Sequence, residues 1–133
     1  MNSENLHINE ITKTDFRSYL IFKKDETKWF YWHLSTNFKN FKPFNFYYKN
    51  NLIGVFCLKR ESKTLVDLYI NKSFRRMGFG ELLIKNLNSK YHNLLFKVNS
   101  HNRNSIDFFE NILSKGIISK KVMNEDVYIY STQ

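Results

Sequence analysis

The segment at residues 75–80, Arg-Arg-Met-Gly-Phe-Gly, limits the possible folds of this chain more than any other. It follows an apolar stretch at 64–71 that is typical of a buried strand, and it opens a stretch whose apolar residues share one helical face. A helix start presents unpaired N–H groups and a partial positive charge, which together bind phosphate. Glycine lets the backbone come close to the anion because it has no Cβ. The segment therefore predicts an anion-binding loop between a strand and a helix.

Two common phosphate-binding loops do not fit this segment. A P-loop places Lys and then Ser or Thr after its last glycine, whereas Gly80 is followed by Glu81 and Leu82. A dinucleotide-binding fingerprint would need a third glycine at Leu83 and an acidic residue about twenty positions further on. The sequence between Glu81 and Asp107 contains no carboxylate.

The hydrophobic period of the chain changes at Pro43. Up to residue 41 the pattern favours a short strand and two helices, the first begun by Thr12 and Asp15. After Pro43 a period of two predicts three strands joined by short turns, which form an antiparallel meander. After the loop we expect a helix, a strand, a helix that ends at Gly116, and two strands. The expected strands span 6–11, 44–49, 52–58, 64–71, 94–98, 117–122 and 127–130. The first two expected helices span 12–24 and 27–41, the third begins at 79 and the fourth begins near 102.

This order of elements, βααβββαβαββ, predicts an α+β fold. It implies a mixed, mostly antiparallel sheet of six or seven strands flanked by about four helices. The length of 133 residues suits a single domain over 1–133, and 42% hydrophobic residues with 17% aromatics supply its core. That aromatic content argues against intrinsic disorder.

The remaining composition excludes further classes of protein. A single cysteine rules out a disulfide scaffold and fits a reducing, cytoplasmic setting. The polar N-terminus predicts no signal peptide, and no apolar run approaches the roughly 18 residues that a membrane-spanning helix needs.

The positive charge of the chain is concentrated in its middle. Twenty-one Lys and Arg against 12 Asp and Glu give +9. Residues 42–106 carry 12 basic and 3 acidic residues, net +9, while the segments before and after carry +1 and −1. Such an excess is typical either of a solvated charged face or of a site for phosphate-bearing partners. The loop at 75–80 favours the second interpretation.

Taken with its context, the loop resembles the signature of the GNAT superfamily of acyl-CoA-dependent N-acyltransferases. That signature is Arg/Gln-x-x-Gly-x-Gly/Ala between the fourth strand and the third helix, and residues 75–80 match it. A second family element, an Asn followed by a small residue and then an aromatic, matches Asn102, Ser105 and Phe109. The order of elements agrees over nearly the whole chain.

The resemblance implies where acetyl-CoA would bind. The loop would hold the pyrophosphate, and a bulge would separate the fourth strand from the fifth so that pantetheine lies between them. Asn102 would contact the pantetheine arm, or cap a helix, or do both. The implied cofactor residues are Leu68, Tyr69, Ile70, Arg75, Arg76, Met77, Gly78, Phe79, Gly80, Asn102, Ser105 and Phe109.

The sequence departs from the family at Phe109. Relatives commonly place there a Tyr whose phenol protonates the leaving thiolate, and Phe has no hydroxyl. A thiol with a pKa of about 8.5 can also take its proton from water. Trp29, Tyr31 and Trp32 in the second helical stretch would form part of the acceptor groove by family likeness, whereas Trp29 and Trp32, taken from their positions alone, are more typical of core residues.

The acceptor amine must be neutral to attack, so a base is expected. Asp67 on the fourth strand is the best-placed carboxylate, unless it is only a solvated strand residue. His33, His92 and His101 are further candidates. Cys57 lies in an apolar strand and suggests a core residue rather than a nucleophile. No Cys/His cluster indicates a metal.

Three functions follow from these observations. The first is an N-acetyltransferase in which an amine attacks acetyl-CoA directly, with an acceptor that could be anionic, such as nucleic acid, tRNA or a nucleotide-sugar. The second is a basic nucleic-acid-binding module without catalysis, since basic residues interleaved with aromatics suit such binding. The third is a CoA-binding pseudoenzyme, suggested by Phe109. The family resemblance also makes a homodimer conceivable, and no membrane partner is expected.

Overall fold

Seven strands form one sheet in a computed structural model that describes residues 1–91 and 93–131, leaving aside the side chains of residues 20, 29 and 120. The strand order is β1-β2-β3-β4-β5-β7-β6. Every neighbouring pair is antiparallel except β4 and β5. The strands are β1 (Leu6–Glu10), β2 (Phe41–Tyr48), β3 (Asn51–Lys59), β4 (Thr64–Ile70), β5 (Leu95–Asn99), β6 (Lys120–Asn124) and β7 (Val127–Ser131).

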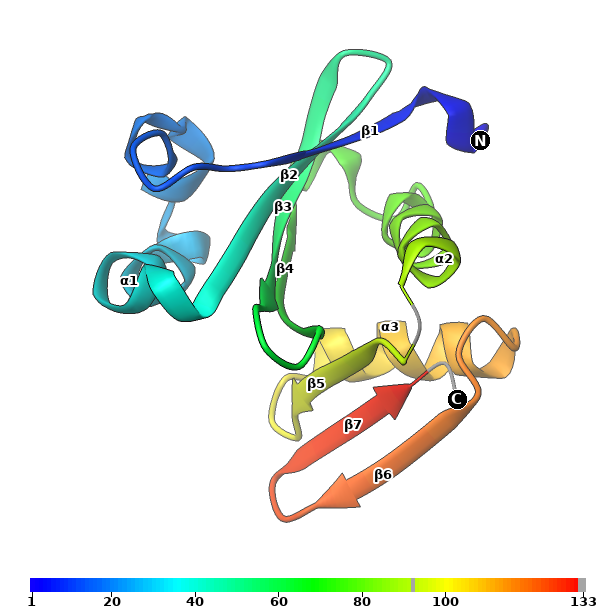
Figure 1. Cartoon of the computed structure of the whole chain (residues 1–133). Coiled ribbons are helices and arrows are strands. Elements are labelled where there is room, and N and C mark those ends of the chain that lie inside the picture. The colour runs from blue at the N-terminus through cyan, green and yellow to red at the C-terminus, as the bar shows by residue number, and fades with distance from the viewer. Residues whose placement is uncertain (92, 132–133) are drawn as a thin grey trace.

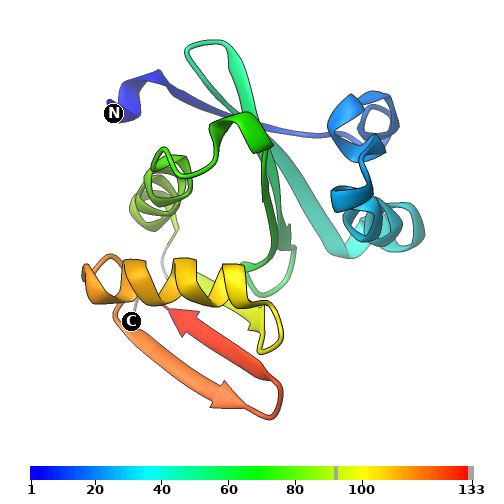
Figure 2. The same ribbon diagram turned by 180° about the vertical axis from the view of Figure 1, so that it is seen from behind.

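Helices cover both faces of the sheet (Figure 1). Helix α1 (Lys28–Asn37) lies on one side, and α2 (Phe79–Lys90) and α3 (Arg103–Ser114) lie on the other, as the view from behind also shows (Figure 2). Two clusters of buried residues match these faces. Phe56, Leu83 and Ile112 belong to the larger one, and Phe30 and Val55 belong to the smaller one under α1. The predicted mixed, mostly antiparallel sheet and the α+β class are confirmed.

The predicted helix at 12–24 is wrong. The chain instead forms three short 3₁₀ turns, Phe16–Ser18, Leu20–Lys23 and Asp25–Thr27, so the described residues contain three α-helices rather than about four. At 100° per residue, an α-helix would point Phe16, Ile21 and Phe22 in three different directions. Extended backbone at Tyr19 interrupts the helical path, and all three side chains are buried.

Strands β4 and β5 form the feature that positions the site. They pair only at their beginnings, Thr64 with Leu95 and Leu65 with Phe96. Beyond that point β4 continues along β3 while β5 leads away below it (Figure 1). A bulge accompanies the separation, because Cys57 pairs with Asp67 while the next residue of β3 pairs with Leu65. The sheet is therefore open between the last halves of these two strands.

Gly54 allows β3 and β4 to stay together beside this opening. It lies opposite Ile70, and a Cβ at this position would overlap the backbone carbonyl oxygen of Tyr69. We expect Gly54→Ala to lower the free energy of unfolding by about 1–3 kcal/mol, because the obstacle is backbone and cannot rotate away. Urea unfolding of the two proteins measures the difference, and equal stabilities would contradict the packing described here.

Candidate active site

The loop after β4 reaches helix α2 through left-handed backbone. Arg76 has φ 61°, and Gly78, the N-cap residue of α2, has φ 89°. No side chain caps this helix start. The first N–H groups of a helix have no partner within the helix, so the start of α2 presents donors and the positive end of the helix dipole. This geometry suits an anion, as the sequence predicts.

The start of α2 packs against α3 at Gly80. A Cβ on Gly80 would lie 2.8 Å from Cε1 of Phe108 and 3.3 Å from Cδ1 of Ile70. The Phe108 ring therefore packs directly on the backbone of the first turn of α2. This contact brings α3 to the same place as the loop and the end of β4.

The end of β4 directs backbone groups that do not pair with β3 toward the opening. Asn71 donates its N–H to the carbonyl of Ile53, which identifies it as a hydrogen-bonded residue of the β3–β4 ladder. Because such residues alternate along an antiparallel pair, Leu68 and Ile70 direct their N–H and C=O groups away from β3. They face the space in which β5 would lie if it still paired. A ligand with amide groups can bind along this edge as an added strand would.

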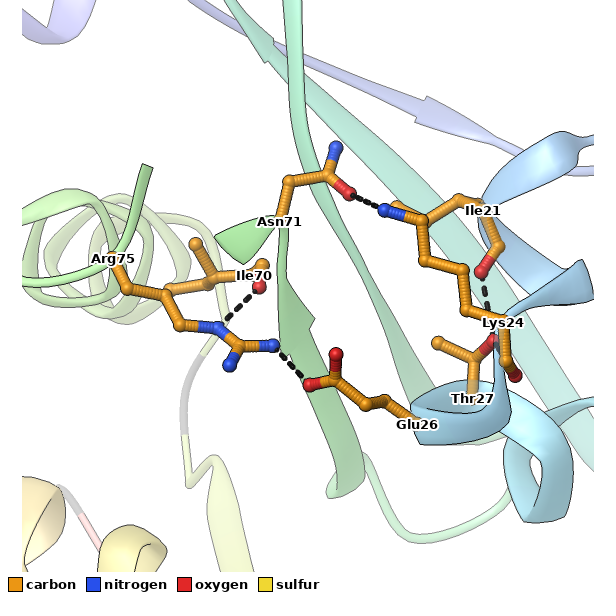
Figure 3. Close-up of polar contacts among 7 residues, drawn as sticks. All are labelled: Ile21, Lys24, Glu26, Thr27, Ile70, Asn71 and Arg75. Carbon is orange, nitrogen blue, oxygen red and sulfur yellow. Dashed lines mark hydrogen bonds and ion pairs between the residues drawn. The ribbon is translucent and has the colours of Figure 1, made fainter. Parts of the chain in front are cut away.

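Arg75 connects the loop to the segment before α1 (Figure 3). Its Nε donates to the carbonyl oxygen of Ile70 at 2.8 Å, and its guanidinium donates to Glu26 at 2.6 Å. It also lies over the Tyr69 ring, 5.1 Å from the centroid. The hydrogen bond from Arg75 holds the pKa of the Glu26 carboxyl below its usual value. The Arg75 side chain thus secures the loop instead of reaching toward the α2 start.

A second contact of the same kind lies beside it. Lys24 donates from Nζ to Oδ1 of Asn71 at 3.0 Å (Figure 3). Asn71 in turn donates from Nδ2 to the carbonyl of Leu52. Residues 24–26 are therefore bound to the residue that follows β4 and to the loop beyond it. Lys24, Glu26 and Phe108 are not among the site residues predicted from the sequence. No sequence signal could have found the first two, because 47 and 49 residues separate them from their partners.

The electrostatic surroundings of the α2 start are positive. Glu81 in its first turn accepts a hydrogen bond from Lys115 at 2.7 Å and pairs with Lys85 at 3.6 Å. The hydrogen bond from Lys115 lowers the pKa of Glu81. Two cations therefore offset this carboxylate, while Arg76 and Lys72 are exposed nearby in the chain. An anion at the helix start would meet a net positive surface.

Asn102 and Phe109 have structural roles in α3. The side chain of Asn102 accepts a hydrogen bond from the N–H of Ser105 at 3.2 Å and so caps the helix. Phe109 is only 4% exposed, with ring centroids of Phe96 and Tyr130 at 5.3 and 5.2 Å. Its ring belongs to the core, and the aromatic side chain that faces the loop is Phe108.

Asp67 and His33, two of the candidate bases, lie together. Oδ2 of Asp67 is 3.6 Å from Nδ1 of His33. The Asp67 side chain is 1% exposed and the His33 side chain is 33% exposed. Burial raises the pKa of Asp67 to about 7. A pKa near the working pH is what a group that exchanges protons needs.

The remaining residues predicted for the acceptor groove or as bases lie in different surroundings. Tyr31 packs on Phe16 with ring centroids 5.6 Å apart, and Trp32 is 61% exposed beside His33. The side chain of Trp29 and the whole of His92 lie outside the described residues. His101 is exposed in the turn before α3.

Cys57 is a buried core thiol, as predicted, and burial raises its pKa. Within residues 1–91 and 93–131, no group of three His, Cys, Asp or Glu side chains could hold a metal ion. The described helices also include none long and apolar enough to cross a membrane.

Comparison with known families identifies the class of protein. A family model described as an acetyltransferase (GNAT) domain matches residues 33–112, which is more than half of the chain. The matched region contains the meander, the loop, α2 and most of α3. The chain therefore belongs to the GNAT acetyltransferases. No curated protein matches the sequence.

Solved structures share the fold at low sequence identity. An acetyltransferase from Thermus thermophilus superposes with a TM-score of 0.64 and 15% identity, covering 98% of each chain. A GNAT family acetyltransferase from Elizabethkingia anophelis with acetyl-CoA bound gives 0.60 and 14%, covering 98% of this chain and 99% of that one. A KacTA–DNA complex gives 0.61 and 18%, covering 96% and 93%. The likeness extends over almost the whole chain and is one of fold.

Proposed function

We propose that this chain is a single-domain N-acetyltransferase that transfers acetyl from acetyl-CoA to an amine by direct attack. The observation that carries this proposal is the open edge of β4 beside the uncapped start of α2. The two features together match a ligand with amide groups at one end and a pyrophosphate at the other. The neighbour from Elizabethkingia anophelis has acetyl-CoA bound.

Different residues around the opening would bind different parts of acetyl-CoA. The N–H groups at residues 76–81 bind the pyrophosphate, and the backbone of Leu68 and Ile70 binds the pantetheine amides. The side chain of Arg75 already donates a hydrogen bond to the carbonyl oxygen of Ile70. The N–H of Ile70 therefore remains for the thioester end of acetyl-CoA. The new N–C bond forms as the C–S bond breaks. With Phe109 in the core, the thiolate takes its proton from solvent.

A hollow on the α1 side suggests an anionic acceptor. It has a volume of about 310 Å³, and its lining includes Lys59, Lys97 and Thr64. Thr64 begins β4 and pairs with Leu95, so the hollow lies at the paired end of β4 and β5, on the face opposite α2 and α3. Glu125 also lines the hollow, so its two ammonium groups leave a net positive charge of one. Phosphate groups of a nucleotide or nucleic acid would complement this charge. One fold neighbour was solved as a complex with DNA.

Thiol release tests the proposed reaction. Acetyl-CoA is incubated with the protein and a panel of amines that includes tRNA, DNA, an amino sugar and small amines. We expect amine-dependent release of CoA thiol with one of them, and equimolar acetylated product by mass spectrometry. Saturable acetyl-CoA binding without release would indicate a pseudoenzyme. Salt-sensitive nucleic-acid binding without any acetyl-CoA binding would favour the non-catalytic module.

Asn102 allows its two proposed roles to be separated. N102A removes the cap acceptor, and we expect it to lower the free energy of unfolding by about 1 kcal/mol. N102D keeps an acceptor for the N–H of Ser105 but loses the amide donor. We expect N102D to retain the stability and to bind acetyl-CoA severalfold more weakly in calorimetry. Unchanged affinity in N102D would limit Asn102 to capping.

A further inference from the structure

The carboxyl group of Asp67 is buried where the sheet begins to open. It is the second residue after Leu65, the last residue of β4 that pairs with β5. Its side chain points to the α1 face, because it lies opposite Cys57 of the smaller core cluster. Neither carboxylate oxygen has a hydrogen-bond partner within the described residues. Burying a carboxyl group without hydrogen-bond partners lowers the stability of the folded state. The presence of Asp67 at this position therefore calls for a reason other than stability.

His33 provides the polar neighbour from the opposite element. It reaches Asp67 from α1, with Nδ1 3.6 Å from Oδ2. Its ring is stacked on Phe41, with planes 3° apart and centroids at 5.7 Å, and the centroid of the Trp32 ring lies 5.5 Å away. These rings fix the imidazole plane, and a third of the side chain remains exposed. The two residues therefore form a pair in which only the histidine can be reached from outside.

Other titratable groups of the described residues lie on this face of the sheet, among them the Tyr69 hydroxyl two residues further along β4. The Cys57 thiol lies across from Asp67 on β3, and its pKa is raised by burial and by Asp67. The Arg60 guanidinium acts on the same thiol in the opposite sense. On β5, Lys97 lies on the same sheet face as Thr64 and lines the hollow. Burial alone accounts for the raised pKa of Asp67.

We propose that His33 is the proton acceptor for the amine in this acetyl transfer, and that Asp67 is a positioning residue whose charge orients the imidazole from the Nδ1 side. This inference rests on the proposed acetyltransferase function. As the N–C bond forms and the C–S bond breaks, the nitrogen loses a proton to Nε2 of His33. The imidazolium then passes this proton to solvent. Asp67 cannot do this itself, because an acceptor amine has no access to a side chain that is 1% exposed.

The tautomer of His33 tests the pair without any acceptor. A carboxylate beside Nδ1 favours the tautomer with its proton on that nitrogen. We expect ¹⁵N NMR at pH 8 to show the Nδ1–H form in the native protein and a shift toward Nε2–H in D67N. The control is D107N, which changes an exposed aspartate of α3 and should leave the signal unchanged. An identical His33 signal in native protein and D67N would overturn the proposal.

Kinetics test the role of His33 in the reaction. Thiol release from acetyl-CoA is measured with ethanolamine and with water alone as acceptors, over pH 6 to 9. General-base catalysis contributes about 100-fold or more, so we expect H33Q to lower the rate by about that factor, to lose the rise with pH and to keep the acetyl-CoA affinity within twofold. H7Q, a change on the exposed surface of β1, serves as the control.

The outcomes separate the two proposals. H33Q retaining a third or more of the native rate overturns the role of His33 and leaves the acetyltransferase function standing. A native protein that neither binds acetyl-CoA nor releases thiol overturns the proposed function, and with it the role of His33 in that reaction. The NMR result then still decides whether Asp67 orients the imidazole.

Discussion

Gly78→Ala is expected to weaken acetyl-CoA binding by about five- to thirtyfold, while Gly116→Ala leaves it unchanged. Both glycines have left-handed backbone, with φ 89° and 74°. An alanine costs roughly 1–2 kcal/mol in that conformation, and every 1.4 kcal/mol corresponds to a factor of ten. At Gly78 the loop can relieve this strain only by moving the donors at the start of α2. At Gly116 the same strain lies beyond the end of α3.

The two variants form a matched pair because they share the substitution and the backbone conformation. A Cβ at Gly116 meets no atom within 4 Å, and a Cβ at Gly78 meets only the flexible end of Met1 at 3.0 Å. We therefore expect similar losses of stability in urea unfolding and a difference only in calorimetric titration with acetyl-CoA. Equal affinities of G78A and the native protein would mean that the loop does not bind the anion.

Asp67→Asn is expected to make the protein more stable at alkaline pH. Burial raises the pKa of Asp67 from 3.8 to about 7, so the folded state holds a proton that the unfolded chain has already released. The stability that this proton gives is present at low pH and is lost as the pH rises through 7. The advantage of D67N over the native protein should grow by about 3 kcal/mol between pH 4.5 and pH 8.

Urea unfolding at several pH values measures this advantage. D107N serves as the control, and its difference from the native protein should not depend on pH in the same way. An advantage of D67N that shrinks with rising pH would mean that the fold stabilises the carboxylate. A substitution that raises stability while lowering turnover is expected of a residue retained for function.

The sheet could be predicted because its strands carry local signals. The alternation after Pro43 and the short turns fix a meander, and glycines at 78 and 80 mark the entry to α2. Capping of α3 by Asn102 was likewise one of the roles predicted from sequence. These features depend on residues a few positions apart, and short-range patterns record them well.

The contacts that complete the site could not be predicted in this way. Segment 12–24 has helical spacing in part, yet tertiary packing of Phe16, Ile21 and Phe22 gives three turns. The attachment of Glu26 to Arg75 and the approach of His33 to Asp67 join residues 49 and 34 positions apart. The family pattern also assigned Phe109 to the site, whereas its ring is in the core and Phe108 faces the loop. Only the fold brings these residues together.

Amide chemical shifts during titration with acetyl-CoA test the central claim most directly. We expect saturable changes that are largest for the backbone N–H groups of residues 76–81 and of Leu68 and Ile70, with smaller changes on β6 and β1. The absence of saturable changes, or changes confined to the hollow at Lys59 and Lys97, would contradict the assignment of the loop and the open edge of β4 as the acetyl-CoA site.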